Sequence, residues 1–219
     1  MKWKTKKTLI FIIPLVLIIV ASVFFLVIFL PKQMTSETYY NAYNNSKLTK
    51  QEQITTILDG DNLVYEKTET LIFDNDKIYH KIIEKTLSVD INKYFDETVV
   101  EYYYTKDKMY YLENDTWKTK DFKFEDNLKN YEFKDSYFES FVFEKDIISK
   151  ADFKGKIKNE NLNNVLGFEN DFKDAELVIT INFEAKIQAL NITAKTGQNR
   201  DVVIKNSFSY EKQNVVLPS

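Results

Sequence analysis

The chain has 219 residues, with 30 basic and 33 acidic side chains, a net charge of −3 and no cysteine. This length allows one ordinary domain of about 100–200 residues and an additional segment. Without cysteine the chain has no disulfide, no thiol nucleophile and no cysteine-ligated metal, so its stability must come from its core. The lipid anchor of a bacterial lipoprotein also requires a cysteine and is excluded.

An uninterrupted apolar segment lies near the N-terminus. The 22 residues Leu9–Leu30 contain no charged side chain. As a helix they would be about 33 Å long, enough to cross a hydrocarbon core of about 30 Å. Four lysines lie within the first seven residues and only Lys32 closely follows the segment. Because basic residues stay in the cytoplasm, this asymmetry predicts a cytoplasmic N-terminus.

The alternative interpretation of this segment is a cleaved signal peptide. Its apolar region would be about 7–15 residues long and end at small residues. Cleavage at Ala21 and Ser22 would leave the apolar residues 23–30 exposed to water, so we expect a retained anchor. The sequence thus predicts a single-pass protein of the cell membrane, with a cytoplasmic tail at 1–7, a transmembrane helix at 8–30, a tether at 31–36 and an extracytoplasmic domain at 37–219.

The predicted outer domain is acidic. Four of the 30 basic residues precede the apolar segment, so residues 32–219 carry 26 basic and 33 acidic side chains, a net charge of −7. Nucleic acids and anionic membrane surfaces bind basic surfaces. We therefore expect no nucleic-acid partner.

The first part of the outer domain has helical patterns. Apolar residues recur at helical spacing within 39–43 and again within 54–58. Thr49 and Glu52 have the spacing of a capping box, and Gly60 follows as a helix stop. These patterns predict two short helices.

Alternation of apolar and polar residues then indicates strands. Tyr, Phe, Ile, Val and Thr are abundant there, and Asp and Asn mark the turns. The pattern predicts strands over 62–73, 78–87, 98–105 and 108–113, with another near Trp117.

Helical spacing returns over 136–150, where Ser136 and Glu139 form a second capping-box pattern. A short strand over 153–157 and a small helix between Asn159 and Gly167 are expected next. Alternation then predicts strands over 177–183, 189–192 and 202–210, and Val215–Pro218 ends the chain. The total is eight or nine strands.

This element order, with the closing pattern from Phe208 to Pro218, resembles the LolA/LppX-like lipoprotein-carrier fold over roughly Glu37–Pro218. In that family an incomplete β-barrel wraps around helices, and the hollow between them holds acyl chains. The resemblance implies an α+β fold: a transmembrane helix, then a largely antiparallel β-meander forming a half-barrel-like sheet with short helices packed on one face. The chain departs from the family by lacking the anchoring cysteine and by keeping a span, which argues against a freely shuttling carrier.

Aromatic residues are dense in the outer domain: residues 31–219 hold 13 Phe, 14 Tyr and one Trp. One interpretation is an apolar cavity that accepts a lipid. The other is a packed core with exposed cross-strand aromatic pairs. Consecutive tyrosines in a strand point to opposite faces, so at most half of each run faces inward. The expected cavity lining is Leu71, Phe73, Phe138, Phe141, Ile179, Ile181 and Phe208.

Residues that suggest catalysis are sparse. His80 is the sole histidine, and nothing near it has the spacing of a metal site or a Ser-His-Asp triad. The Asp- and Asn-rich segments 59–62 and 74–76 lack the pattern of a calcium loop and are typical of turns. The sequence therefore predicts no catalytic residue, no metal ligand, no cofactor and no enzyme activity.

The sequence as a whole predicts a membrane-anchored extracytoplasmic binding module for a lipid or other hydrophobic ligand. The alternative is an envelope-structural or protein–protein interaction domain with a solid core and no small ligand. The expected partners are the membrane, through the N-terminal helix, a lipid-like ligand and an envelope protein.

Overall fold

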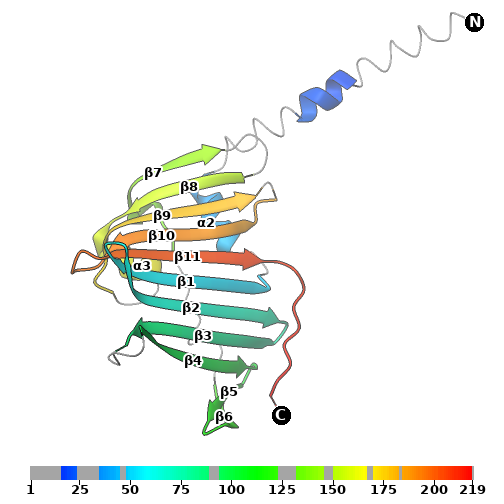
Figure 1. The fold of residues 1–219 in the computed structure, drawn as a ribbon. Helices are drawn as coiled ribbons and strands as arrows, with labels where there is room; N and C mark the ends of the chain where they lie inside the picture. Colours follow the sequence, from blue (N-terminus) through cyan, green and yellow to red (C-terminus); the bar gives the residue numbers. More distant parts are fainter. Residues whose placement is uncertain are drawn as a thin grey trace, which may run out of the picture.

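An antiparallel sheet of eleven strands makes up most of the part of the chain that the structure describes (Figure 1). The structure is a computed structural model, and it describes residues 16–23, 35–44, 48–88, 94–122, 132–145, 150–166, 170–182 and 184–218. The strands are β1 (Lys50–Asp59), β2 (Asn62–Asp74), β3 (Lys77–Leu87), β4 (Phe95–Tyr104), β5 (Lys108–Glu113), β6 (Thr116–Asp121), β7 (Phe138–Lys145), β8 (Lys150–Ile157), β9 (Lys173–Asn182), β10 (Ile187–Lys195) and β11 (Asp201–Ser209).

The sheet consists of two meanders, β1 to β6 and β7 to β11, and the first strand of one pairs with the last strand of the other. Its spatial order is β6-β5-β4-β3-β2-β1-β11-β10-β9-β8-β7. Each meander pairs strands that are neighbours in the sequence, and β1 pairs with β11 to join the two. We call β1 to β6 the N-terminal half of the sheet and β7 to β11 the C-terminal half.

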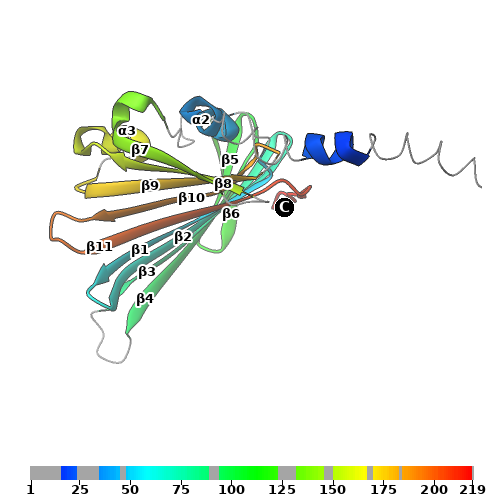
Figure 2. The ribbon, with the colours of Figure 1, turned by 90° about the horizontal axis from the view of Figure 1, so that it is seen from above.

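Short helices lie on one face of this sheet, which we call the inner face (Figure 2). They are α2 (Ser36–Asn44) and α3 (Leu162–Leu166), the latter preceded by a 3-10 turn, η4 (Asn159–Asn161). A second 3-10 turn, η3 (Asp135–Tyr137), leads into β7. The helix α2 contacts β9 and β10, so the helices lie over the C-terminal half. A mostly antiparallel open sheet with few short helices is the architecture that the sequence predicted for the outer domain.

The hydrophobic core lies between the C-terminal half and the helices. In β9 every second residue from Ala175 to Ile181 faces inward and is fully buried, as the alternation in the sequence predicted. Tyr39 of α2 packs against Phe153 of β8 with 5.7 Å between the ring centroids. Further buried residues of this core include Leu162, Val165, Leu166, Leu177, Ile179, Ile181, Leu190, Ile192, Val202 and Ile204.

The helix predicted around 54–58 is wrong, because these residues belong to β1. The inward-facing residues of β1 include Gln51, Gln53 and Thr55, so polar side chains stand where the pattern of a strand calls for apolar ones. The expected capping box does not form either, since the hydroxyl of Thr49 donates to the carbonyl of Ser209 at 2.9 Å.

The helix predicted over 136–150 is also wrong where the structure describes it, because 138–145 form β7. The pairing of β7 with β8 shifts register between Phe138 and Ser140, which marks a β-bulge. An extra residue in a bulge lets side chains three positions apart lie on one face. Phe138 and Phe141 both contact Phe153 for this reason, and their spacing imitates one turn of a helix.

The predicted membrane anchor lies largely outside the described residues. Residues 16–23 are helical, whereas the rest of 8–30, the tail at 1–7 and the tether through residue 34 are not described. Among the residues that the structure describes, no helix is long and apolar enough to cross a membrane.

Gly155 of β8 lies beneath an aromatic ring, which gives a first testable prediction. A Cβ at this position would stand 2.6 Å from Cδ1 of Phe138, whose side chain is buried. Gly155→Ala should therefore lower the free energy of unfolding by about 1–3 kcal/mol, measured by urea denaturation. In a Phe138→Leu background the same substitution should cost less; an equal cost in both backgrounds would show that the ring is not the obstacle.

Candidate functional site

The two halves of the inner face differ in how completely their side chains are buried. Residues opposite one another in antiparallel strands share a face, so the register identifies the inner face. One such row crosses five strands through Phe208, Gln51, Leu71, His80 and Tyr102. On β8 to β11 most inward residues are buried, whereas on β7 and in the N-terminal half many stay partly or largely exposed.

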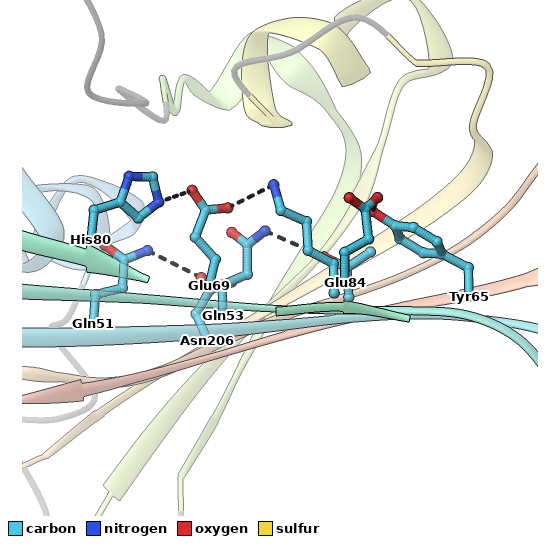
Figure 3. Close-up of polar contacts among 9 residues, drawn as sticks. Gln51, Gln53, Tyr65, Glu69, His80, Glu84 and Asn206 are labelled. Carbon is cyan, nitrogen blue, oxygen red and sulfur yellow. Dashed lines mark hydrogen bonds and ion pairs between the residues drawn. The ribbon is translucent and has the colours of Figure 1, made fainter. Parts of the chain in front are cut away.

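A group of polar side chains occupies the middle of the inner face, on β1, β2, β3 and β11 (Figure 3). Polar groups in such positions are costly unless they form hydrogen bonds. No side-chain nitrogen or oxygen buried within the described residues lacks a hydrogen-bond partner. We call this group the polar patch: Gln51, Gln53, Thr55, Tyr65, Lys67, Glu69, His80, Glu84 and Asn206.

Glu69 is the centre of the charged part of the patch. Its Oε1 lies 2.8 Å from Nε2 of His80, and its Oε2 lies 3.2 Å from Nζ of Lys67 (Figure 3). The Glu69 side chain is only 11% exposed, and that of His80 16%. Water is largely displaced from this carboxylate, so its two partners must replace the lost hydration.

The amides of the patch connect β1 with β11. Nε2 of Gln51 donates to Oδ1 of Asn206 at 3.2 Å, and Nδ2 of Asn206 donates to the carbonyl of Leu190 at 3.1 Å. Nε2 of Gln53 donates to the hydroxyl of Thr55 at 3.3 Å. These bonds hold the polar residues at the boundary between the patch and the hydrophobic core.

At the other side of the patch, the Tyr65 hydroxyl donates to Oε1 of Glu84 at 2.7 Å. Burial and this carboxylate raise the pKa of the Tyr65 hydroxyl above its usual value, because both disfavour a phenolate. Tyr65 therefore remains a hydrogen-bond donor at neutral pH.

Aromatic side chains of β4 lie beside the polar patch. The His80 ring lies 6.0 Å from the Tyr102 ring and 6.3 Å from the Tyr104 ring, and Tyr104 lies 4.9 Å from Phe122. Burial raises the pKa of Tyr104 to about 12. The inner face of the N-terminal half therefore combines a polar centre with partly buried aromatic rings, which is an amphipathic surface.

The outer face of the N-terminal half also carries aromatic residues. Tyr103, between two inward tyrosines, lies 5.0 Å from Tyr79 and 5.2 Å from Trp117. The run of three tyrosines thus divides between the two faces, as the geometry of a strand requires. These outer contacts are the cross-strand aromatic pairs of the alternative interpretation.

The seven residues predicted to line a cavity all lie on the inner face but not around one site. Phe138, Ile179 and Ile181 are buried in the core, at 5%, 0% and 0% exposure. Phe208 is partly buried beside Tyr43, with 5.8 Å between their rings.

The other three predicted residues keep more contact with solvent. Phe141 is 38% exposed on β7 at one edge of the sheet. Leu71 and Phe73 are partly buried on β2, and the register places Leu71 between Gln51 and His80. Of the seven, Leu71 and Phe208 thus belong to the row that crosses the polar patch at Gln51 and His80.

The polar patch itself was not predicted from the sequence. The sequence of β2 does indicate a polar group on this face, because Lys67 and Glu69 interrupt the row of Tyr65, Leu71 and Phe73. His80 lies in β3, the strand that the sequence predicts over 78–87. No cluster of three or more His, Cys, Asp or Glu side chains suited to a metal ion occurs among the described residues.

Comparison with known proteins gave similarity of fold only. No protein-family model and no curated protein matches the sequence. Among solved structures, the chain is similar to LprF from Mycobacterium bovis, with 12% identity over 84% of this chain and 97% of LprF and a TM-score of 0.41. It is also similar to the lipoprotein LppX from Mycobacterium tuberculosis, with 12% identity over 84% of this chain and all of LppX (100%) and a TM-score of 0.39.

Proposed function

We propose that this chain is a membrane-anchored binding module that presents the inner face of its sheet, outside the cytoplasm, to a lipid-like ligand. The observation that carries the proposal is the difference between the two halves of that face. Apolar side chains of the C-terminal half, such as Leu190, are fully buried, whereas Leu71 and Tyr102 of the N-terminal half remain partly exposed. Covering them with acyl chains would remove apolar surface from water, at about 25 cal/mol per Å².

The polar patch supports an amphiphile rather than a plain hydrocarbon. An acyl chain alone would leave the polar atoms of Lys67, Glu69 and His80 facing an apolar neighbour, which is unfavourable. A ligand with a polar end could place that end at the patch and its chain along the aromatic rings of Tyr102 and Tyr104. Small-ligand sites typically combine a mainly apolar lining with a few polar groups that fix orientation.

Adjacent residues on opposite faces of β2 allow a matched test. Leu71 faces inward between Gln51 and His80, and Ile72 faces outward between Lys50 and Tyr79. In the full chain purified in mild detergent, Leu71→Glu should weaken binding of a fluorescent fatty acid at least tenfold, because it adds a charge to the proposed apolar lining. Ile72→Glu should change the affinity less than twofold.

Two results would contradict the proposal. One is a wild-type protein that carries no co-purified lipid by mass spectrometry and takes up no fluorescent fatty acid. The other is an equal loss of binding in the Leu71→Glu and Ile72→Glu proteins while both remain folded by circular dichroism.

The anchor is part of the same proposal and rests on the apolar segment Leu9–Leu30 with its preceding lysines. Protease added to intact cells should degrade the domain at 37–219, because it would lie outside the cytoplasm. Protection of this domain until the cells are lysed would contradict the proposed orientation.

A further inference from the structure

One carboxylate of the polar patch has no cation beside it. Oε1 of Glu84, a partly buried residue, accepts a hydrogen bond from the Tyr65 hydroxyl at 2.7 Å (Figure 3). Among the residues that the structure describes, Glu84 forms no ion pair and no further hydrogen bond. Because Tyr65 stays neutral, its hydroxyl holds the carboxylate in place but leaves the negative charge uncompensated.

The outer face of the sheet carries the same arrangement of tyrosine and glutamate with a lysine added. The Tyr79 hydroxyl donates to Oε1 of Glu101 at 2.9 Å, and Nζ of Lys81 lies 3.3 Å from the same oxygen. The two arrangements lie one strand apart, on β2 and β3 and on β3 and β4. The missing cation is therefore particular to the inner face, where we propose that a ligand binds.

The charges around Glu84 leave this part of the inner face negative. Lys67 lies directly opposite Glu84, but its Nζ lies 3.2 Å from Oε2 of Glu69. His80 is four residues from Glu84 along β3, about 13 Å at the spacing of a strand. The register also places Asp96 on the inner face. On the inner face of β1 to β4, as the register defines it, three carboxylates thus accompany one ammonium group.

We propose that the lipid-like ligand has a positively charged head, an amine or a quaternary ammonium group, which pairs with Glu84. This inference rests on the proposed function, because it assigns the polar end of the same ligand. The head would supply to Glu84 the charge that Lys81 supplies to Glu101 on the outer face. The ring of Tyr65 lies beside this carboxylate, and aromatic rings attract ammonium groups.

The chain of such a ligand would run from Glu84 along β3 and β4. The next inward pair consists of Ile82 and Val100, which lie directly opposite one another and are partly buried. The pair after that consists of His80 and Tyr102. Successive positions on the same two strands therefore offer a charged partner for the head and apolar and aromatic partners for the chain.

Three probes with the same alkyl chain separate the charge of the head from burial of the chain: dodecyltrimethylammonium, dodecanol and dodecanoate. Their affinities for the full chain in a non-ionic detergent are measured by isothermal titration calorimetry. The ammonium probe should bind about fivefold more tightly than the alcohol, as expected for a partly exposed ion pair, and dodecanoate should bind most weakly.

The results for these probes distinguish the inference from the function on which it rests. Equal affinities for the three probes, or tightest binding of dodecanoate, would overturn the assignment of a cationic head and leave the lipid-binding function in place. Binding of none of the three would contradict both.

Two substitutions show whether the preference comes from Glu84. Glu84→Gln should reduce the affinity for dodecyltrimethylammonium about fivefold and leave the affinity for dodecanol unchanged, since the amide oxygen can still accept a hydrogen bond from Tyr65. Glu101→Gln is the matched control, because it removes the same charge beside Tyr79 on the outer face. It should change each affinity less than twofold. Equal effects of the two substitutions would mean that the net charge of the domain attracts the probe, and would overturn the role of Glu84.

Reversing the charge gives an independent measurement. Glu84→Lys should reverse the order of the probes, so that dodecanoate binds more tightly than dodecyltrimethylammonium. A Glu84→Lys protein that is folded by circular dichroism and still prefers the ammonium probe would contradict the proposed pairing.

Discussion

Phe153→Ala is expected to lower the free energy of unfolding by about 3–5 kcal/mol, the usual cost of removing a buried aromatic ring. Phe153 is completely buried in β8. Its ring lies within 5.3–5.7 Å of five other aromatic rings, which come from α2 and β7: Tyr39, Tyr40, Phe138, Phe141 and Phe143. Removing the ring would leave a cavity between the helix and the sheet, because these neighbours are held by their own strands and helix.

Urea denaturation followed by circular dichroism measures this loss. Phe95→Ala provides the control, since Phe95 lies on the outer face of β4 with a ring contact to Tyr94 at 4.6 Å. It should cost about 1 kcal/mol or less. If the two substitutions cost the same, the cluster around Phe153 is not the centre of the core.

Glu69→Ala should have the second largest effect and lower the free energy of unfolding by about 2–3 kcal/mol. Removing one member of a buried ion pair leaves its partner without compensation, at about 3–5 kcal/mol for a fully buried pair. The value should be lower here because Lys67 remains 26% exposed and keeps some contact with water. Glu69→Gln should lose less, since its amide oxygen can still accept a hydrogen bond from His80.

The sheet contains a matched control for this substitution. Lys50 and Glu52 on the neighbouring strand β1 have the same two-residue spacing as Lys67 and Glu69, and their charged atoms lie 3.3 Å apart. This pair faces outward, with both side chains 37% exposed. Glu52→Ala should therefore change the unfolding free energy by less than about 1 kcal/mol. Comparable losses at Glu52 and Glu69 would mean that burial on the inner face adds nothing.

The local sequence pattern was sufficient to predict most of the strands. The strands predicted over 62–73, 78–87 and 108–113 correspond to β2, β3 and β5. The short strand at 153–157 and the small helix after Asn159 are present as well. These elements alternate with the period of their own secondary structure and end at turn residues, so neighbouring residues carry the whole signal.

The two failures, β1 and β7, depend on contacts distant in sequence. The inward face of β1 is polar because Gln51 meets Asn206 of β11, which is 155 residues away. A sequence pattern contains no sign of that pairing. In β7 a bulge against β8 shifts the alternation and gives phenylalanines a helix-like spacing.

The sequence by itself determined the strand-rich class, the order of most elements, the division of consecutive tyrosines between two faces and the absence of cysteine chemistry. Only the tertiary structure decided which face of each strand carries the helices, and that Glu69 meets His80 across two strands in a partly buried polar patch. The physical reason is that alternation is a property of one strand. Burial, by contrast, depends on strand register and on the helix packed above, and both are set by the whole chain.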